Sequence, residues 1–284
     1  MTDPSVDAVA AWGDRVRANR EQVDRLREVP DGADFYARVT SMFRADPRRK
    51  DEPVLDLLLA LARPQDTWLD IGAGGGRYAL PLALAVREVI AIDPSAGMLA
   101  VLRELMQEHG IANVRVVEGR WPPDGALAPQ LGPLPIADVA LIAHVGYDIE
   151  AIGPFLDAME AAARRTCVAV LMDSTPASVA APFWPPVHGE PRVPLPAMPE
   201  FVGLLRARGR EPHVAEAQRE PRRFESREAL EASLRRQLWI ADGGEKERRY
   251  RELLDRLVVE DDGHFGLAGQ GPLPVRVVTW SPPR

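Results

Sequence analysis

Cysteine is almost absent from this chain of 284 residues, in which Cys167 is the only one. A single cysteine excludes a disulfide within the chain and a cluster of thiolate metal ligands. Cys167 lies in the apolar run "TCVAVLMD", so we interpret it as a buried core thiol. His213 and His264 have no histidine or cysteine at a metal-ligand spacing, and the sequence therefore predicts no metal site.

Lysine is also scarce, since only Lys50 and Lys246 occur among 35 basic residues. The formal net charge is −7, which does not favour a nucleic acid as partner, although an acidic chain can still bind one through a local patch. An arginine cluster between residues 222 and 236 is interleaved with glutamates, a pattern typical of a solvated helical face.

Long apolar runs are missing too. No run approaches the roughly 20 residues of a membrane span. The N-terminal stretch "MTDPSVDAVAAWGDR" has no basic segment followed by an apolar core, so no signal peptide is visible. We therefore expect a cytoplasmic protein that does not bind membranes.

Residues 1–63 are expected to form an N-terminal helical cap. Apolar residues recur at helical spacing from Trp12 to Leu26, again over 35–43, and in "EPVLDLLLALAR", which Pro64 ends. Tyr36 could close over a ligand from this cap.

From residue 64 onward, short apolar runs alternate with amphipathic segments. The runs "TWLDIG", "EVIAIDPS", "NVRVVEG", "ADVALIAHV" and "TCVAVLMDS" predict buried strands, because a parallel sheet covered on both faces has continuous rather than alternating hydrophobicity. The fold class is therefore α/β, with a mostly parallel sheet wound on both faces. "EPHVAEAQ" and "LPVRVVTWSPP" are candidates for two later strands. Residues 175–199, with eight prolines, predict an extended loop or lid, and 226–262 a helical insertion.

The stretch "LDIGAGGGRYALPLA" places four glycines between the first strand and a helix. Such a turn lets the backbone approach a ligand, and the helix points its N–H groups and positive dipole end at it. Asp93 ends the second strand, where a carboxylate can accept both hydroxyls of a ribose. The turn and Asp93 together predict a bound nucleoside.

The turn does not match a dinucleotide site. The pattern G-x-G-x-x-G/A fails when counted from Gly72, because Arg77 occupies its third small position. Asp70, two residues before Gly72, would repel a pyrophosphate but attract a cation such as an amino-acid ammonium group.

These segments resemble the class I S-adenosylmethionine-dependent methyltransferases. "LDIGAGGGRYALPLA" is similar to their first motif, "VIAIDPSAGMLA" to the second, and "VVEGRW" and "ADVALIAHV" to the third and fourth, over about Trp68 to Ser174. The resemblance implies a Rossmann-like sheet of seven strands with an antiparallel last strand, a methyltransferase domain over 64–284, and S-adenosyl-L-methionine as cofactor.

The resemblance also implies positions for the cofactor. Many relatives have an acid where this chain has Arg120, so the adenine is expected to be held by a backbone group or by Trp121 and Met98. The implied cofactor-binding residues are Asp70, Gly72 and Gly74 around the methionine moiety, Ala73 and Arg77 in the same turn, Asp93 at the ribose, Pro94 and Met98 beside the adenine, Gly119, Arg120 and Trp121 after the third strand, and His144 after the fourth.

Candidates for acid–base work lie in "AHVGYDIE". His144 is a candidate because a histidine side chain ordinarily titrates near neutral pH, and Tyr147 and Asp148 on the same loop could orient a substrate. His144 could equally contact only the cofactor or fill space. His188, with its aromatic neighbours Phe183 and Trp184, could line a substrate pocket or merely anchor its loop.

The first functional hypothesis is methyl transfer to a small-molecule acceptor, because the tetrapeptide after the fourth strand is "AHVG" and not an N-P-P-Y-like motif of nucleic-acid methyltransferases. Two alternatives stay open: a cofactor-binding module without transferase activity, and an RNA or protein methyltransferase. The sequence leaves the oligomeric state undecided between monomer and homodimer.

Overall fold

Seven strands form one sheet in the order β3-β2-β1-β4-β5-β9-β6 in the computed structural model, which describes residues 3–30 and 44–283. β9 runs antiparallel to β5 and β6, and the other neighbouring strands are parallel. This arrangement confirms the predicted fold class, including both later strands. The bounds are β1 Thr67–Ile71, β2 Glu88–Asp93, β3 Val114–Glu118, β4 Ala137–Ala143, β5 Ala163–Met172, β6 His213–Arg219 and β9 Leu273–Trp280.

The strands are apolar on both faces because helices cover both faces. Side chains alternate between the faces along a strand. Leu69 and Ile71 of β1 therefore join one core cluster, and Trp68 joins the other. Every residue of β1 is buried, which explains its continuous hydrophobicity.

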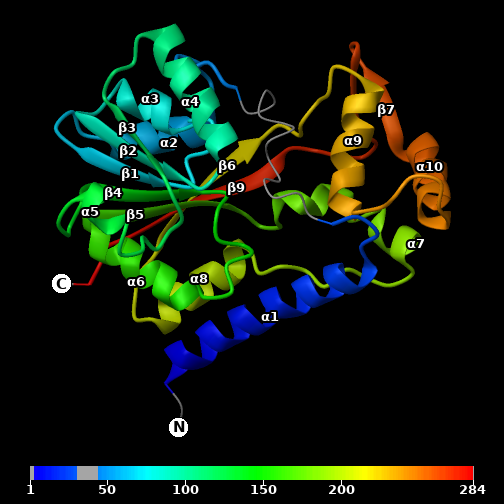
Figure 1. Ribbon diagram of the computed structural model, residues 1–284, viewed down its shortest axis with the longest axis horizontal. Coiled ribbons are helices and arrows are strands. Elements are labelled where there is room, and N and C mark those ends of the chain that lie inside the picture. Colours follow the sequence, from blue (N-terminus) through cyan, green and yellow to red (C-terminus); the bar gives the residue numbers. More distant parts are fainter. Residues whose placement is uncertain (1–2, 31–43, 284) are drawn as a thin grey trace.

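Among the described residues, three helices cover one face of the sheet and four cover the other (Figure 1). The first layer holds α2 (Pro53–Leu61), α3 (Ala79–Ala83) and α4 (Ala96–His109), and α2 reaches β6 and β9. The second layer holds α5 (Ala128–Leu131), α6 (Ile152–Ala162), α8 (Met198–Ala207) and the long α1 (Pro4–Leu26), which contacts α6 and α8.

A third apolar cluster forms a separate helical lobe, drawn at the right of Figure 1. We use "helical lobe" for residues 176–189 and 221–269. Its core includes Phe183, Trp184 and Leu234, and Val23 of α1 packs into it. The lobe contains the 3-10 helix η2 (Pro176–Ala180), α7 (Trp184–His188), α9 (Arg227–Leu238), α10 (Glu245–Leu257) and the hairpin of β7 (Val258–Asp261) and β8 (His264–Leu267).

Two expectations about this part of the chain were wrong in detail. Residues 175–199 are not wholly extended, because they contain η2, α7 and the start of α8. Half of the eight prolines lie in the first turns of these helices, where the missing N–H costs no hydrogen bond, and the other half lie in the segments between them. The segment 226–262 ends in a strand, β7, where β-branched Val258 and Val259 follow α10. The prediction for 35–43, with Tyr36, lies outside the described residues.

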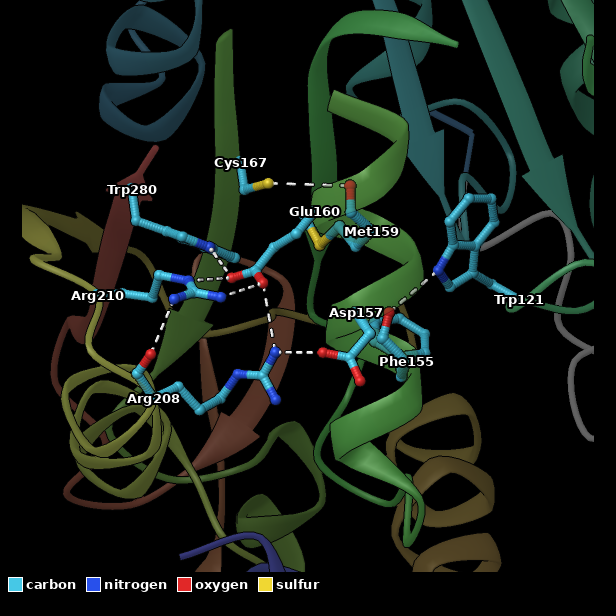
Figure 2. Close-up of polar contacts among 9 residues, drawn as sticks. All are labelled: Trp121, Phe155, Asp157, Met159, Glu160, Cys167, Arg208, Arg210 and Trp280. Carbon is cyan, nitrogen blue, oxygen red and sulfur yellow. Dashed lines mark hydrogen bonds and ion pairs between the residues drawn. The ribbon is translucent and has the colours of Figure 1, made fainter. Parts of the chain in front are cut away.

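A buried ionic cluster fastens α6 to β9 and to the segment after α8 (Figure 2). Glu160 accepts hydrogen bonds from the indole of Trp280 at 2.9 Å and from Arg210 Nε and Nη2 at 2.9 and 2.8 Å. Burial raises the pKa of Glu160, but the hydrogen bonds from Arg210 and Trp280 outweigh it, and the pKa is lowered. Cys167 lies beside this cluster, fully buried, as the sequence predicted.

No helix within residues 3–30 and 44–283 has the length and apolarity needed to cross a membrane.

Candidate functional site

The glycine turn after β1 folds back onto the end of β2. Gly72, Gly74 and Gly76 have φ values of +76°, +53° and +83°, a left-handed region that other residues rarely adopt. The N–H groups of Gly72 and Ala73 both donate to the carbonyl oxygen of Ile92, at 2.8 and 3.1 Å. The conformation of the turn therefore requires glycine.

The turn also leaves no room for side chains. A Cβ at Gly72 would lie 2.5 Å from Val145 Cγ2, and one at Gly74 would lie 3.0 Å from Met98 Cε. The loop after β4 and the first turn of α4 thus enclose the glycines from two sides. The residues Ala73, Gly74 and Met98 that the sequence assigned to the cofactor lie together here.

Asp93 joins three loops at the carboxyl edge of the sheet. Its Oδ2 accepts the N–H of Gly74 at 2.9 Å, and its Oδ1 accepts the N–H of Ser95 at 2.8 Å. Its backbone carbonyl accepts the N–H of Gly119 at 3.1 Å. These bonds fix the orientation of the carboxylate relative to the turn.

Asp70 lies under the same turn and is almost fully buried. Burial raises its pKa to about 7, and the charge of Asp93 adds to the rise, while a hydrogen bond with the Ala79 backbone opposes it. A cationic ligand beside the two acids would favour the ionised form of Asp70.

His144 follows β4 in the left-handed region, with φ +58°, and its backbone N–H donates to Val170 at 2.8 Å. Both ring nitrogens are buried and have no hydrogen-bond partner among the described residues. Burial lowers the pKa of His144 to about 4, with further lowering from Arg219 and Arg77 and an opposing effect from Glu52. The imidazole is therefore neutral at pH 7, with one donor and one acceptor.

The two other acid–base candidates lie in different surroundings. The hydroxyl oxygen of Tyr147 accepts the backbone N–H of Met172 at 2.8 Å, and burial raises the pKa of Tyr147. Asp148 is exposed to solvent. The structure therefore does not bring His144, Tyr147 and Asp148 into one hydrogen-bonded group.

The residues assigned to the adenine side are spread over a wider area. Met98 is buried against Gly74, whereas Pro94 and Arg120 are exposed. The indole of Trp121 donates to the carbonyl oxygen of Phe155 at 3.3 Å, which fastens it to α6 (Figure 2). Gly119 is enclosed by Leu127 of the following segment, 2.4 Å from where its Cβ would lie.

The family model described as "Methyltransferase domain" matches residues 69–125, which run from β1 across the turn, Asp93 and Trp121. Residues 69–125 are thus similar to a methyltransferase domain. The cofactor of this family is S-adenosyl-L-methionine, as the sequence predicted.

Among curated proteins, the chain is 42% identical over 59 residues to the 23S rRNA (uracil(1939)-C(5))-methyltransferase RlmD of Xanthomonas campestris pv. campestris (strain 8004), covering 21% of this chain and 13% of that protein. It is 30% identical over 122 residues to a probable cobalt-precorrin-6B C(15)-methyltransferase (decarboxylating) of Methanothermobacter thermautotrophicus, covering 42% of this chain and 60% of that protein. The matched part thus spans less than two thirds of either relative.

Among solved structures, the YcgJ protein of Bacillus subtilis superposes with a TM-score of 0.54 at 16% identity, covering 81% of this chain and 98% of that chain. At this identity the likeness establishes the fold. It extends well beyond residues 69–125.

An arginine-rich wall that the sequence did not reveal adjoins the end of the glycine turn, and it begins with Arg49 and Arg77 around Glu52. Glu52 precedes α2 and binds Arg77 Nη2 at 2.8 Å and the side chain of Arg49. Arg49 Nη2 also donates to the Arg77 carbonyl oxygen at 2.8 Å, and both guanidinium groups lie over the ring of Tyr78. The run "RRKDEP" contains two members of this wall, but nothing in it indicates that they reach the turn.

His188 anchors α7 within the helical lobe of the domain. Its Nε2 lies 3.0 Å from the carbonyl oxygen of Leu238 and donates to it, and its ring stacks on Trp184 with centroids 4.2 Å apart. Burial lowers the pKa of His188 to about 4. These contacts favour the anchoring role over a place in a substrate pocket. No group of three or more metal-ligating side chains occurs in the part of the chain that the structure describes.

Proposed function

We propose that this chain transfers a methyl group from S-adenosyl-L-methionine to a small-molecule acceptor. The observation that carries the proposal is the pair of buried acids, Asp70 and Asp93, at the ends of adjacent strands on either side of a left-handed glycine turn. A ligand with a positive charge and a ribose complements the negative charge of these acids. The glycines, which have no side chains, let it approach the backbone of the turn closely.

The residues present fit this cofactor. Asp70 favours a positive charge beside it, Asp93 offers an oriented carboxylate for the ribose, and Met98 supplies apolar surface next to Gly74. When bound, the cofactor supplies an activated methyl carbon and a neutral thioether leaving group. The chain then has to align donor and acceptor, a contribution of roughly 7–11 kcal/mol to lowering a bimolecular barrier.

His144 is our candidate for the base. Its neutral ring can accept a proton from a hydroxyl or nitrogen acceptor as the new bond to carbon forms. Tyr147 and Asp148 stay candidates for orienting the acceptor, Tyr147 from within the loop and Asp148 from its solvent side. Arg77, Arg120 and Trp121 stay candidates for cofactor contacts.

Two observations favour a small acceptor over RNA. The net charge of −7 gives no general attraction to a polyanion. The similarity to the rRNA methyltransferase covers only 13% of that protein, so it does not carry over that protein's RNA binding. A cofactor-binding module without transferase activity is the second alternative.

The test has two stages. Isothermal titration with S-adenosylhomocysteine measures binding, and transfer of a labelled methyl group to a set of small acceptors measures turnover. We expect binding that Asp93→Asn weakens, together with turnover on at least one acceptor class. Binding without any turnover supports the non-catalytic module, and a protein that binds neither form of the cofactor contradicts the proposal.

A further inference from the structure

The arginine-rich wall beside the glycine turn holds more positive than negative side chains. Arg49 and Arg77 share the single carboxylate of Glu52, whose side chain is 17% exposed. Two guanidinium groups on one carboxylate leave a net positive charge in a half-buried setting. Such an excess is costly unless a further anion balances it.

Arg219 adds a third guanidinium to this wall. It is the last residue of β6, so it lies at the same carboxyl edge of the sheet as the glycine turn, and α2 packs against β6. Burial lowers the pKa of Arg219, repulsion by Arg77 lowers it further, and Tyr78 and Glu52 oppose this only in part. Within residues 3–30 and 44–283, Arg219 forms no ion pair with a carboxylate.

Arg222 continues the positive wall three residues later. Its guanidinium lies 5.1 Å from the ring centroid of Phe224, and burial, then Arg219, Arg236 and Arg77, lower its pKa. Arg77, Arg219 and Arg222 thus lie close enough to one another for their positive charges to repel.

His144 lies within reach of the same charges. Arg219 and Arg77 act on its ring, and both ring nitrogens are buried without a partner among the described residues. A hydrogen-bonding ring at the end of β4 thus lies at the same edge of the sheet as Arg219, which forms no ion pair with a carboxylate among the described residues. Both features are satisfied by one kind of ligand, a small molecule with an anionic group at one end and a hydrogen-bonding group at the other.

We propose that the methyl acceptor carries a carboxylate or phosphate group that Arg219 binds beside Arg77, while the ring of His144 faces the rest of the acceptor. This inference rests on the proposed function, since it assigns the acceptor class of the same site. Guanidinium groups suit both anions because their paired N–H groups match two oxygen atoms.

The other arginines of the helical lobe argue against RNA as the source of the anion. Arg223 pairs with Asp261, Arg227 with Glu231 and Asp255, and Arg248 with Glu245 and Glu252. An RNA strand needs a continuous row of available cations. The surplus charge is instead concentrated at the half-buried Arg219 and Arg77.

The test is direct binding of simple anions to the full chain, with and without saturating S-adenosylhomocysteine. Benzoate probes the carboxylate, inorganic phosphate the phosphate, and benzamide is the neutral match of benzoate. We expect saturable binding of at least one anion, no comparable binding of benzamide, and a shift of the His144 ring signals in NMR, assigned with His144→Gln among the five histidines.

The variants locate the binding. Arg219→Gln should weaken the anion roughly 10–100-fold, as expected for a lost charged hydrogen bond, and Arg219→Lys should weaken it less. Arg256→Gln removes the same charge from an exposed position at the end of α10 and should have no effect. The affinity for S-adenosylhomocysteine should be equal in all of them.

The outcomes separate the two proposals. A wild type that binds S-adenosylhomocysteine but neither anion overturns the acceptor assignment alone, as does anion binding that survives Arg219→Gln. Anion binding that depends on Arg219 in a chain that does not bind S-adenosylhomocysteine supports the anion site and contradicts methyl transfer. A single-stranded RNA that displaces benzoate with a steep salt dependence overturns the small-molecule acceptor.

Discussion

The backbone N–H of Gly74 donates to the carboxylate of Asp93 across 2.9 Å. This bond ties the turn after β1 to the end of β2, and the bond from Gly119 to the Asp93 carbonyl extends the tie to β3. One residue therefore sets the relative positions of three loops in the methyltransferase domain. The geometry of the cofactor site should depend on its charge as well as its shape.

Asp93→Asn should weaken S-adenosyl-L-methionine binding by roughly 10–100-fold. The amide keeps the size of the side chain but removes the charge, and hydrogen bonds to a charged group are worth about 1.5–3 kcal/mol. Titration calorimetry measures the change. Glu88→Gln, at the other end of β2, is the matched control and should bind as the wild type does. Equal affinities for the two variants would refute a role for Asp93 in ribose binding.

Gly72→Ala should destabilise the protein more than Gly110→Ala does. Both glycines are left-handed, so each substitution costs about 1–2 kcal/mol of backbone strain. Only Gly72 also faces a neighbour, Val145, and overpacking there adds about 1–3 kcal/mol. Denaturant unfolding gives both values.

Val145→Ala supplies the control for this comparison. In the Gly72→Ala background it should recover the overpacking part of the loss, because it removes the methyl groups that a new Cβ meets. No recovery would show that strain alone accounts for the effect.

The sequence predicted those parts of the structure that depend on local chemistry. The buried strands and the glycine turn follow from residue types within a few positions. Arg219 could not be found in this way. It reaches the site only because β6 pairs with β9 at the far side of the sheet, a contact between distant parts of the chain.

The same limit applies to the roles of individual side chains. The spacing in "AHVGYDIE" placed His144, Tyr147 and Asp148 on one loop. The hydrogen bond from the backbone N–H of Met172 to the Tyr147 hydroxyl joins the end of β5 to that loop, and residues 25 positions apart form it. Eight prolines suggested an irregular segment over 175–199, but helices begin at several of these prolines. The first two of these helices, η2 and α7, are stabilised because their apolar side chains pack into the core of the helical lobe.

Cofactor affinity should rise with pH up to about 7 and then level off. The folded protein without ligand holds Asp70 protonated below that pH, and a cationic ligand binds the ionised form. Calorimetry at pH 6, 7 and 8 measures this dependence. In Asp70→Asn the affinity should be lower and the rise should disappear. Because titration of the cofactor itself affects both proteins equally, the ratio of their affinities isolates Asp70.

Asp70 should also affect stability, in the opposite direction along the pH scale. Its folded pKa is raised from 3.8 to about 7, so the folded chain retains a proton that the unfolded chain has lost. The free energy of unfolding should therefore fall between about pH 4 and pH 7, by on the order of 4 kcal/mol. Asp70→Asn should remove this part of the decline in unfolding experiments, and an unchanged pH dependence would contradict the shift.

Glu160→Ala should lower the free energy of unfolding by about 3–5 kcal/mol, because it leaves the half-buried Arg210 and the buried Trp280 indole without their shared acceptor (Figure 2). Asp157→Ala on the same helix removes an exposed acid that pairs with Arg208 and should cost about 1 kcal/mol or less. Denaturant unfolding compares the two. Similar losses would mean that the Glu160 cluster contributes little.

His144→Gln should reduce methyl transfer to a hydroxyl or nitrogen acceptor by roughly 10²–10⁴-fold and leave cofactor affinity unchanged. Glutamine retains a hydrogen-bonding side chain but cannot accept a proton in the reaction. His264→Gln is the matched control, because His264 is exposed and its Nδ1 lies 2.9 Å from the carbonyl oxygen of Asp262 in the next turn of chain, away from the glycine turn. Single-turnover rates with labelled cofactor separate the chemical step from binding.

The pH dependence gives an independent check on His144. Its folded pKa is lowered from 6.5 to about 4, so the stability that the neutral ring contributes is present above about pH 6.5 and is lost as the pH falls through 4. NMR should therefore find the free enzyme's His144 neutral at pH 6, and the transfer rate should not fall between pH 8 and 6 through protonation of this ring. A rate that falls along a titration near pH 6.5, and that loses this titration in His144→Gln, would show that the ring is solvated in the working enzyme.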